Sequence, residues 1–277
     1  MPELPEVETV VRGLAARMTG RRLAKLDLHR GDLRAPIPKA LRRHAEGRRI
    51  EGVARRAKYI LVALEDGGTL ILHLGMSGRL VLVDPGVALA REAHDHVVFH
   101  LDDGTRIRFN DVRRFGTLDY AAPGKLEGHK LFAHLGPEPL APEFTGQALA
   151  AALKGKRAPL KAALLDQQVV AGLGNIYVCE SLYWAGLSPK RLARTVDAAK
   201  AERLVQAIRD VLLRAIAAGG SSIRDYVQAS GELGYFQHHW AVYDREGEPC
   251  PGCDCKSGIK RIVQSGRSTF YCAKRQR

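Results

Sequence analysis

The stretch YILVALEDGGTLILHLGMSGRLVLV, residues 59–83, decides the fold class. Its apolar runs are rich in Val, Ile and Leu and are separated by EDGG and GMSG, which contain strong turn-forming residues. Two further runs of this kind, HVVFHL and TRIRF, follow at residues 96–101 and 105–109. Short β-rich runs at regular spacing are typical of a sandwich or barrel. We therefore expect residues 22–120 to form a β domain.

Helical patterns lie on both sides of this domain. Upstream, residues 2–14 carry apolar side chains at helical spacing, namely Leu4, Val7, Val10, Val11 and Leu14. Downstream, four Ala- and Leu-rich segments predict helices: FTGQALAAALKGK, APLKAALLDQQVV, NIYVCESLYWAGL and AAKAERLVQAIRDVLLRAIAAGG. The polar, glycine-rich segment SSIRDYVQASGELGYFQ that follows them predicts a loop.

The cysteines are clustered near the end of the chain. Four of the five lie in CPGCDC…YC, as Cys250, Cys253, Cys255 and Cys272, whereas Cys179 stands alone. Clustered cysteines in a cytosolic chain indicate a metal site before disulfides. Two close thiolates and one that returns later in the chain suit a hairpin held by zinc, in which the metal supplies the folding energy. The alternative is a reduced, metal-free tail.

The charge balance narrows the class of partner. The chain has 43 Lys and Arg against 30 Asp and Glu, which gives a net charge of +13. Such a balance favours polyanions through phosphate contacts, although some basic enzymes bind no nucleic acid. No apolar run reaches membrane-spanning length, and the acidic N-terminus does not resemble a secretory signal. We therefore expect no membrane association and a cytoplasmic location.

The first residues, MPELPE, suggest covalent chemistry. Removal of Met1 would expose the secondary amine of Pro2, and an α-amine has a pKa near 7.7–8.0, against about 10.4 for Lys. Such an amine can attack the anomeric carbon of a sugar to give an iminium. Glu3 and Glu6 then lie on one face of the first turn, where carboxylates can protonate a ring oxygen or activate water. The structural alternative is that Pro and acidic residues simply favour a helix start.

Several segments of the chain, taken together, resemble a known enzyme family. MPELPEVETVVRGL strongly resembles the start of the formamidopyrimidine-DNA glycosylases, which remove oxidised guanine from DNA. Further segments resemble that family in order: RRAKYI, HLGMSGRL, HDHVVFHL, NDVRRFG, LLDQQVVAGLGNIYVCE, SSIRDYVQASGELGYFQ and GRSTFYC. The resemblance implies a bacterial, monomeric glycosylase and abasic-site (AP) lyase. It would excise 8-oxoguanine and formamidopyrimidines from double-stranded DNA and nick the strand by β,δ-elimination.

The fold class that follows is α+β and multidomain. We expect an N-terminal β-sandwich domain with its N-terminal helix at residues 1–130. A helix–two-turn–helix domain with a lesion-recognition loop would occupy residues 131–240, and a zinc-finger β-hairpin residues 241–277. No nucleotide cofactor is implied.

The resemblance also assigns catalytic roles. Pro2 would be the nucleophile and Glu3 the general acid/base, with Glu6 supporting water or the sugar. Lys58 would be a proton donor or phosphate contact near the abasic sugar, and Arg267 is linked to δ-elimination. For Lys58 the structural alternative is a strand-end lysine whose stem covers apolar surface.

A second implied set contacts DNA. Met76, Arg113 and Phe115 would fill the space left by the extruded base and so offset part of the cost of flipping it, although Met76 and Phe115 could instead be core residues. The remaining implied contacts are His73, His94, Lys156, Asn175, Tyr243 and Arg261, with Ser221 at the lesion base. His94, His96 and His100 are expected on one strand face, without a fourth ligand that would make them a metal site.

The last residues depart from the family pattern. The family usually ends in YC-x-x-CQ, whereas this chain reads YCAKRQR, with Arg275 at the expected fourth ligand. The additional Cys255 offers a replacement, so we expect one zinc per chain held by Cys250, Cys253, Cys255 and Cys272. Arg275 should then point away from the cluster, toward phosphate. Three thiolates plus water, or weak zinc binding, are the alternatives.

Two rival functions remain at this stage. One is the sister glycosylase for oxidised pyrimidines, endonuclease VIII, which lacks the long GELGYFQ loop. The other is a non-catalytic DNA-binding zinc protein, against which Pro2, Glu3 and Lys58 argue when present together. Borohydride trapping on a lesion duplex separates all three possibilities.

Overall fold

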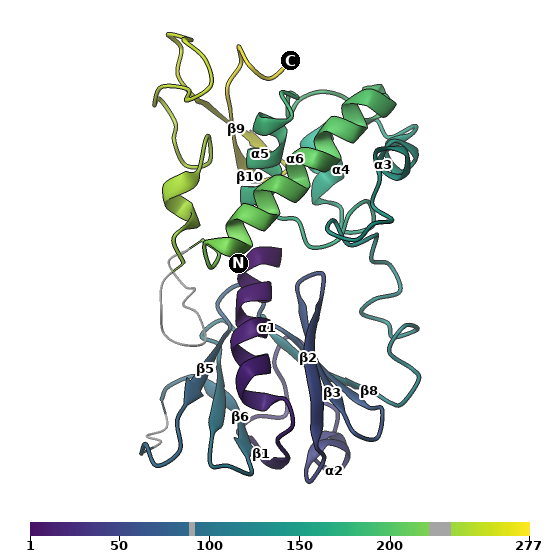
Figure 1. Cartoon of the computed structure of the whole chain (residues 1–277), viewed down its shortest axis with the longest axis vertical. Coiled ribbons are helices and arrows are strands. Elements are labelled where there is room, and N and C mark those ends of the chain that lie inside the picture. Colours follow the sequence, from purple (N-terminus) through teal and green to yellow (C-terminus); the bar gives the residue numbers. More distant parts are fainter. Residues whose placement is uncertain (89–91, 222–233) are drawn as a thin grey trace. The chain divides into compact units, whose positions relative to one another are not determined.

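The computed structural model describes residues 1–88, 92–221 and 234–277 (Figure 1). The chain divides into two compact units. One comprises Met1–Ala133 with Ala218–Tyr235, and the other His134–Ala217 with Phe236–Arg277. The three-domain division at residues 1–130, 131–240 and 241–277 stays a prediction. Among the described helices, none has the length and apolar character needed to cross a bilayer.

The first unit contains two four-stranded antiparallel sheets. One has the strand order β1 (Leu23–Leu28), β6 (Asp95–Leu101), β7 (Arg106–Asn110), β5 (Arg79–Val83), and the other β2 (Ile50–Arg56), β3 (Tyr59–Leu64), β4 (Thr69–His73), β8 (Thr117–Ala121). Buried residues of both sheets join in one hydrophobic cluster. The predicted β domain is therefore a sandwich, and residues 59–83 supply β3, β4 and β5 to its two sheets.

Helix α1 (Leu4–Met18) packs on β2 and β3, and a short helix α2 (Leu41–Ala45) follows β1 (Figure 1). The apolar face predicted for α1 is buried in the same cluster as the sheets. The helix starts later than the predicted residue 2, so Pro2 lies ahead of it and Pro5 occupies its first turn. Helix-start geometry therefore accounts for Pro5 but gives no role to Pro2.

The second unit is helical and ends in a hairpin. Its helices are α3 (Gly146–Leu153), α4 (Leu160–Leu165), α5 (Asn175–Trp184) and α6 (Ala198–Ala217), with 3₁₀ turns η1 (Ala193–Thr195) and η2 (Phe236–His239). Strands β9 (Lys260–Gln264) and β10 (Arg267–Tyr271) pair antiparallel, and α5 packs against β10. The four predicted helices and the α+β class are confirmed. The predicted loop at residues 221–237 lies mostly outside the described residues, which omit 222–233.

Candidate functional site

The N-terminal carboxylates are held by hydrogen bonds to the backbone. Glu3 is the N-cap of α1, and its carboxylate accepts from the backbone N–H of Glu6. In return, Glu6 Oε2 accepts the backbone N–H of Glu3 at 2.9 Å, and Glu6 Oε1 accepts that of Ser221 at 2.8 Å. Both carboxylates are buried, and Pro2, also buried, directly precedes them. The local sequence thus orients two acids beside the predicted nucleophile.

Lys58 and His73 are brought together at one end of the second sheet. Lys58 is buried in the turn between β2 and β3, and the next residue, Tyr59, pairs with His73 on β4. Burial, followed by the charges of Lys58 and Arg34, lowers the pKa of His73 to about 4, so its ring is neutral at pH 7. The backbone N–H of Gly75 donates to His73 Nδ1 at 2.9 Å, which leaves the ring proton on Nε2. His73 can therefore donate one hydrogen bond.

Two loops carry the three residues predicted to fill the DNA stack. Met76 lies between β4 and β5, and Arg113 and Phe115 lie between β7 and β8. Met76 and Phe115 are 37% and 41% exposed, so neither belongs to the core. The Arg113 guanidinium lies 4.8 Å from the centre of the Phe115 ring. The three side chains are therefore available at the surface.

A buried polar contact joins these loops. Ser77 Oγ donates to Asp111 Oδ1 at 2.6 Å and accepts from the backbone N–H of Arg113 at 3.1 Å. Gly75 has φ of +61°, and a Cβ there would stand 2.4 Å from the Phe115 carbonyl. Only glycine fits such an approach, so this position sets the spacing of the two loops.

His94 lies ahead of β6, so the three histidines are not all on one strand face, contrary to the expectation from spacing; the rings of His94 and His96 meet edge-on with their centres 6.4 Å apart. His94 precedes β6 with a φ of 70°, and a register shift follows between Asp95 and Val97. His96 is buried with Nε2 2.8 Å from the Asp111 carbonyl, whereas His100 lies 2.9 Å from Asp27. The irregular start of the strand is the physical reason. His94 is exposed, and its contact with DNA stays a prediction.

In the second unit, Asn175 and Tyr243 meet at the start of α5. Asn175 Nδ2 donates to the Ser268 carbonyl at 3.0 Å and lies 3.4 Å from the Tyr243 hydroxyl. Asn175 Oδ1 is buried, with no partner among the described residues. The helix N-terminus, Tyr243 and the hairpin strand β10 therefore converge on one residue that was predicted to contact phosphate.

The predicted basic contacts of this unit are less closely grouped. Lys156 Nζ lies 3.4 Å from Asp166 in a partly exposed ion pair. Arg261 donates to Ser268 Oγ at 3.1 Å, and Arg267, at the start of β10, is exposed. Arg261 and Arg267 are thus presented by the hairpin, whereas Lys156 stands apart from it in the sequence and in its contacts.

Two buried charges were not singled out from the sequence. Lys161 is fully buried and donates to the Ser268 carbonyl at 2.9 Å and to Thr269 Oγ1 at 2.6 Å. It therefore ties α4 to the hairpin strand β10. The only sequence signal was a charge inside an apolar helical run, which is usually taken as a solvated position.

Glu180, on α5, is the second buried charge that the sequence did not single out. Its carboxylate accepts the backbone N–H groups of Ala241, Val242 and Tyr243 at 2.8–2.9 Å. Burial raises the pKa of Glu180, and the three hydrogen bonds partly offset this. The carboxylate fixes the backbone that carries Tyr243 beside Asn175.

The four C-terminal cysteines form a cluster. Their sulfur atoms lie within 4.8 Å of one another, and Cys272 Sγ is 3.5 Å from the sulfurs of Cys253 and Cys255. Tetrahedral zinc with bonds of about 2.3 Å requires sulfurs about 3.8 Å apart. Burial opposes ionisation of Cys250, but hydrogen bonds from Tyr183 and Gly252 lower its pKa to about 7. The donor set therefore fits a thiophilic ion such as zinc, with Cys255 in place of a residue at 275.

The expected direction of Arg275 is wrong. Its guanidinium donates to the Gly252 carbonyl at 3.3 Å and lies 4.9 Å from the centre of the Tyr183 ring. The nearby aromatic face and carbonyl stabilise the cation within the protein, so the side chain is not directed toward phosphate.

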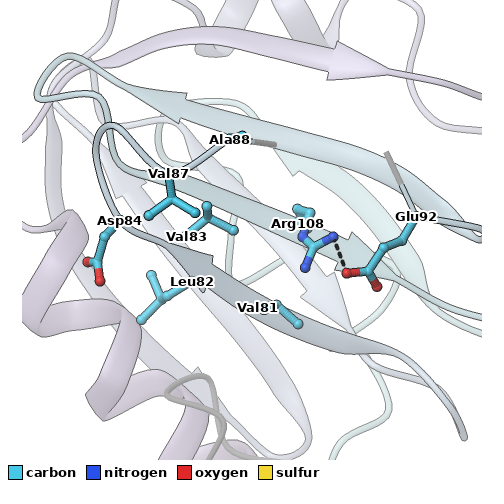
Figure 2. Close-up of a pocket in the computed structure, with 8 residues that line it drawn as sticks. All are labelled: Val81, Leu82, Val83, Asp84, Val87, Ala88, Glu92 and Arg108. Atoms are coloured by element: carbon cyan, nitrogen blue, oxygen red, sulfur yellow. Dashed lines mark ion pairs between the residues drawn. The ribbon is translucent and has the colours of Figure 1, made fainter. Parts of the chain in front are cut away.

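A separate pocket lies beside β5 and contains none of the predicted site residues (Figure 2). It has a volume of about 340 Å³ and is lined mainly by valines and Leu82, with an Arg108–Glu92 ion pair of 2.7 Å at one end. Its two carboxylates are engaged in ion pairs, Glu92 with Arg108 and Asp84 with Arg17.

Two family models match the chain. Residues 1–118 match the formamidopyrimidine-DNA glycosylase N-terminal domain, and residues 135–227 match the H2TH domain of that enzyme. The formamidopyrimidine-DNA glycosylases of Rhodospirillum centenum and Paracoccus denitrificans are both 57% identical to this chain. The match covers 100% of this chain and of the first relative, and 98% of this chain and of the second.

Solved structures agree with the sequence relatives. The MutM (Fpg) protein of Thermus thermophilus is 42% identical, with a TM-score of 0.87 over 99% of this chain and 98% of that one. The wild-type Fpg (MutM) of Lactococcus lactis, in complex with DNA containing N7-benzyl-Fapy-dG, is 33% identical, with a TM-score of 0.89 over 99% of both chains. Because sequence and structure agree over the whole length, the chain belongs to the formamidopyrimidine-DNA glycosylase family.

Proposed function

We propose that this protein is a base-excision repair enzyme that removes oxidised purines from DNA and then cleaves the strand as an AP lyase. The observation that carries the proposal is the arrangement of Glu3 and Glu6, each held by backbone hydrogen bonds directly after Pro2. A structural helix start accounts for the acids, which stabilise the N-terminus of a helix, but not for a proline ahead of the cap.

The residues support a covalent mechanism. Once Met1 is removed, the Pro2 amine attacks the anomeric carbon of the damaged nucleotide, and the bond to the base breaks. Glu3 serves as general acid/base at the sugar, and Glu6 orients it through their reciprocal hydrogen bonds. Protonation of the ring oxygen by a carboxylic acid then breaks the bond between that oxygen and the anomeric carbon, which opens the sugar to the iminium. β-elimination, in which the iminium loses a C2′ proton and the 3′ phosphate departs, nicks the strand. Lys58 acts near the sugar, and Arg267 acts in the second elimination.

DNA binding is supported by charge and by the loops. A net charge of +13 favours a polyanion, and the Fpg protein of Lactococcus lactis was solved with DNA containing N7-benzyl-Fapy-dG or an abasic site. Met76, Arg113 and Phe115 occupy the space vacated by the flipped nucleotide. Contacts with the duplex come from His73, His94, Lys156, Asn175, Tyr243 and Arg261. Ser221 lies at the lesion side, and its backbone already binds Glu6.

A single structural zinc completes the proposal. Cys250, Cys253, Cys255 and Cys272 would hold it, and the ion would supply the cross-link that a short hairpin cannot obtain from its own core. The hairpin then presents Arg261 and Arg267 to DNA. We further propose that the protein acts as a monomer in the cytoplasm, where its substrate is accessible.

Borohydride trapping tests the nucleophile. The protein with a duplex containing 8-oxoguanine should give a covalent complex whose tryptic map leads to the N-terminal peptide. Trapping at Lys58 would contradict the role of Pro2. Preferential trapping on oxidised pyrimidines would favour the endonuclease VIII alternative, and binding without trapping would favour a non-catalytic DNA-binding protein.

A further inference from the structure

Arg275 lies three residues after Cys272, a member of the cysteine cluster, in the turn that ends the chain. The backbone N–H of Gln276 donates to the Cys272 carbonyl at 2.9 Å, and the Cys272 N–H donates to Gln276 Oε1 at 2.9 Å, so residues 272–276 form a closed turn. Because the second cysteine of a C-x-x-C pair binds the same metal from this register, residue 275 starts beside the cluster.

The Arg275 side chain contacts helix α5 and the turn at residues 250–253. Its guanidinium donates to the carbonyls of Tyr183 and Gly252, at 3.4 and 3.3 Å, and lies 4.9 and 6.0 Å from the ring centres of Tyr183 and Trp184. One side chain therefore links the last turn of α5 to the turn at residues 250–253.

The contact among these groups is tight. A Cβ at Gly252 would stand 2.5 Å from the Tyr183 hydroxyl and 2.7 Å from an Arg275 guanidinium nitrogen. The Tyr183 hydroxyl also lies 3.5 Å from Cys250 Sγ. Tyr183 is buried, so its position cannot adapt freely. Arg275, Gly252 and Tyr183 thus form a layer that contacts the metal ligands from outside.

We propose that Arg275 is a positioning residue for the metal site: it fixes the 250–253 turn on α5, while Cys255 occupies the corner that a cysteine at position 275 could otherwise fill. The proposal rests on the zinc site proposed above. Arg275 touches no metal in this arrangement. It acts through Gly252 and Tyr183 on the position of the Cys250 sulfur.

Two consequences separate this role from that of a ligand or a simple surface arginine. Loss of the Arg275 side chain should leave four thiolates on the metal but loosen their enclosure. Outer contacts of metal ligands commonly change metal affinity by about 10–100-fold. In addition, a cysteine at position 275 should be able to replace Cys255 as the fourth metal ligand.

The experiment compares full-length variants loaded with zinc or cobalt. Arg275→Ala should keep one metal per chain and the visible cobalt spectrum of a four-thiolate site, yet release zinc to a chelator about tenfold faster. Arg275→Lys, which keeps the charge but lacks the planar fork, should fall between Arg275→Ala and the parent protein. Arg277→Ala is the matched control, because Arg277 donates only to Lys274 among the side-chain contacts of the described residues.

The exchange is tested in a double variant. Cys255→Ser should lose the four-thiolate cobalt spectrum, and Cys255→Ser combined with Arg275→Cys should regain it. Zinc release from Arg275→Ala or Arg275→Lys at the rate of Arg277→Ala would overturn the positioning role. A double variant that matches Cys255→Ser would overturn the exchange. A parent protein that binds neither metal would overturn the zinc site itself, and the positioning role with it.

Discussion

The two ends of the chain reach their chemistry by different physical means. At the N-terminus, Glu3 and Glu6 are oriented by hydrogen bonds within one helical turn. At the C-terminus, Cys250 and Cys272 are brought together across a hairpin, and their surroundings include Tyr183 from α5. The first arrangement is local, whereas the second depends on contacts between segments far apart in sequence.

This difference predicts how each region responds to substitution. A local capping arrangement survives conservative substitutions, because its hydrogen bonds require only an acceptor at each position. A cluster of thiols depends on every ligand, since the hairpin is too small to hold its shape without them. Substitutions of the N-terminal acids should therefore change catalysis without unfolding the protein. Substitutions of the cysteines should change folding and function together.

The largest expected effect is the loss of catalysis caused by the substitution Glu3→Gln. Base excision should fall by about 10²–10⁴-fold, the range of general acid/base catalysis, while cleavage of a preformed abasic site persists. The fold should be retained, because the amide oxygen still accepts the backbone N–H of Glu6. Single-turnover assays on both substrates and thermal unfolding measure this. Glu8→Gln is the control in the same helix, and equal loss on both substrates would contradict the role of Glu3.

The second effect concerns the dependence of DNA binding on zinc binding by the cysteines. Cys255→Ser should lower zinc content and DNA affinity together, with affinity falling by about tenfold, because the hairpin carries Arg261 and Arg267. Metal analysis and titration of a lesion duplex at fixed salt measure the two quantities. Cys179→Ser, on α5, should change neither. Full zinc and full affinity in Cys255→Ser would remove Cys255 from the ligand set.

The third effect is a pH dependence of stability from His73. Above pH 6.5 the ring is neutral in both folded and unfolded chains, so it contributes no pH dependence. Between pH 6.5 and about 4 only the unfolded chain takes up the proton, because burial and nearby cations lower the folded pKa. The free energy of unfolding should fall with pH in this window by about 3 kcal/mol from this residue.

Urea unfolding of His73→Gln tests this contribution. The variant should lose less stability than the parent protein between pH 7 and pH 4. His29→Gln, which alters an exposed histidine, should follow the parent. Parallel curves for all three proteins would mean that His73 titrates alike in both states.

The smallest effect tests the two loops that carry Met76, Arg113 and Phe115. Phe115→Ala should slow excision from duplex DNA by about tenfold, since three side chains share a flipping cost of a few kcal/mol. Cleavage opposite a preformed gap or in a single strand should change less. Val112→Ala removes another exposed side chain of the same loop and should leave both rates unchanged. Equal slowing by Phe115→Ala on all substrates would exclude the wedge role.

Local patterns predicted much of the fold. The short apolar run at residues 59–64, bounded by turn residues, predicted β3, and the helical spacing of apolar side chains in residues 4–14 predicted α1, because both signals lie within a few residues. Glycine at position 75 marked a turn because glycine adopts the positive φ found there without a steric penalty. The start of α1 was misplaced because Pro2 fits a helix start equally well, and the cap at Glu3 decides the boundary.

The sequence by itself determined the sandwich strands, the helices, the paired N-terminal acids and the composition of the cysteine cluster, because these depend on short-range spacing and side-chain chemistry. Only the tertiary structure decided that Lys161 and Glu180 are buried polar anchors, that His94 lies ahead of strand β6, and that Arg275 packs on Tyr183. The physical reason is that the energy of a charged or polar side chain depends on partners far along the chain. Those partners become neighbours only once the backbone has folded.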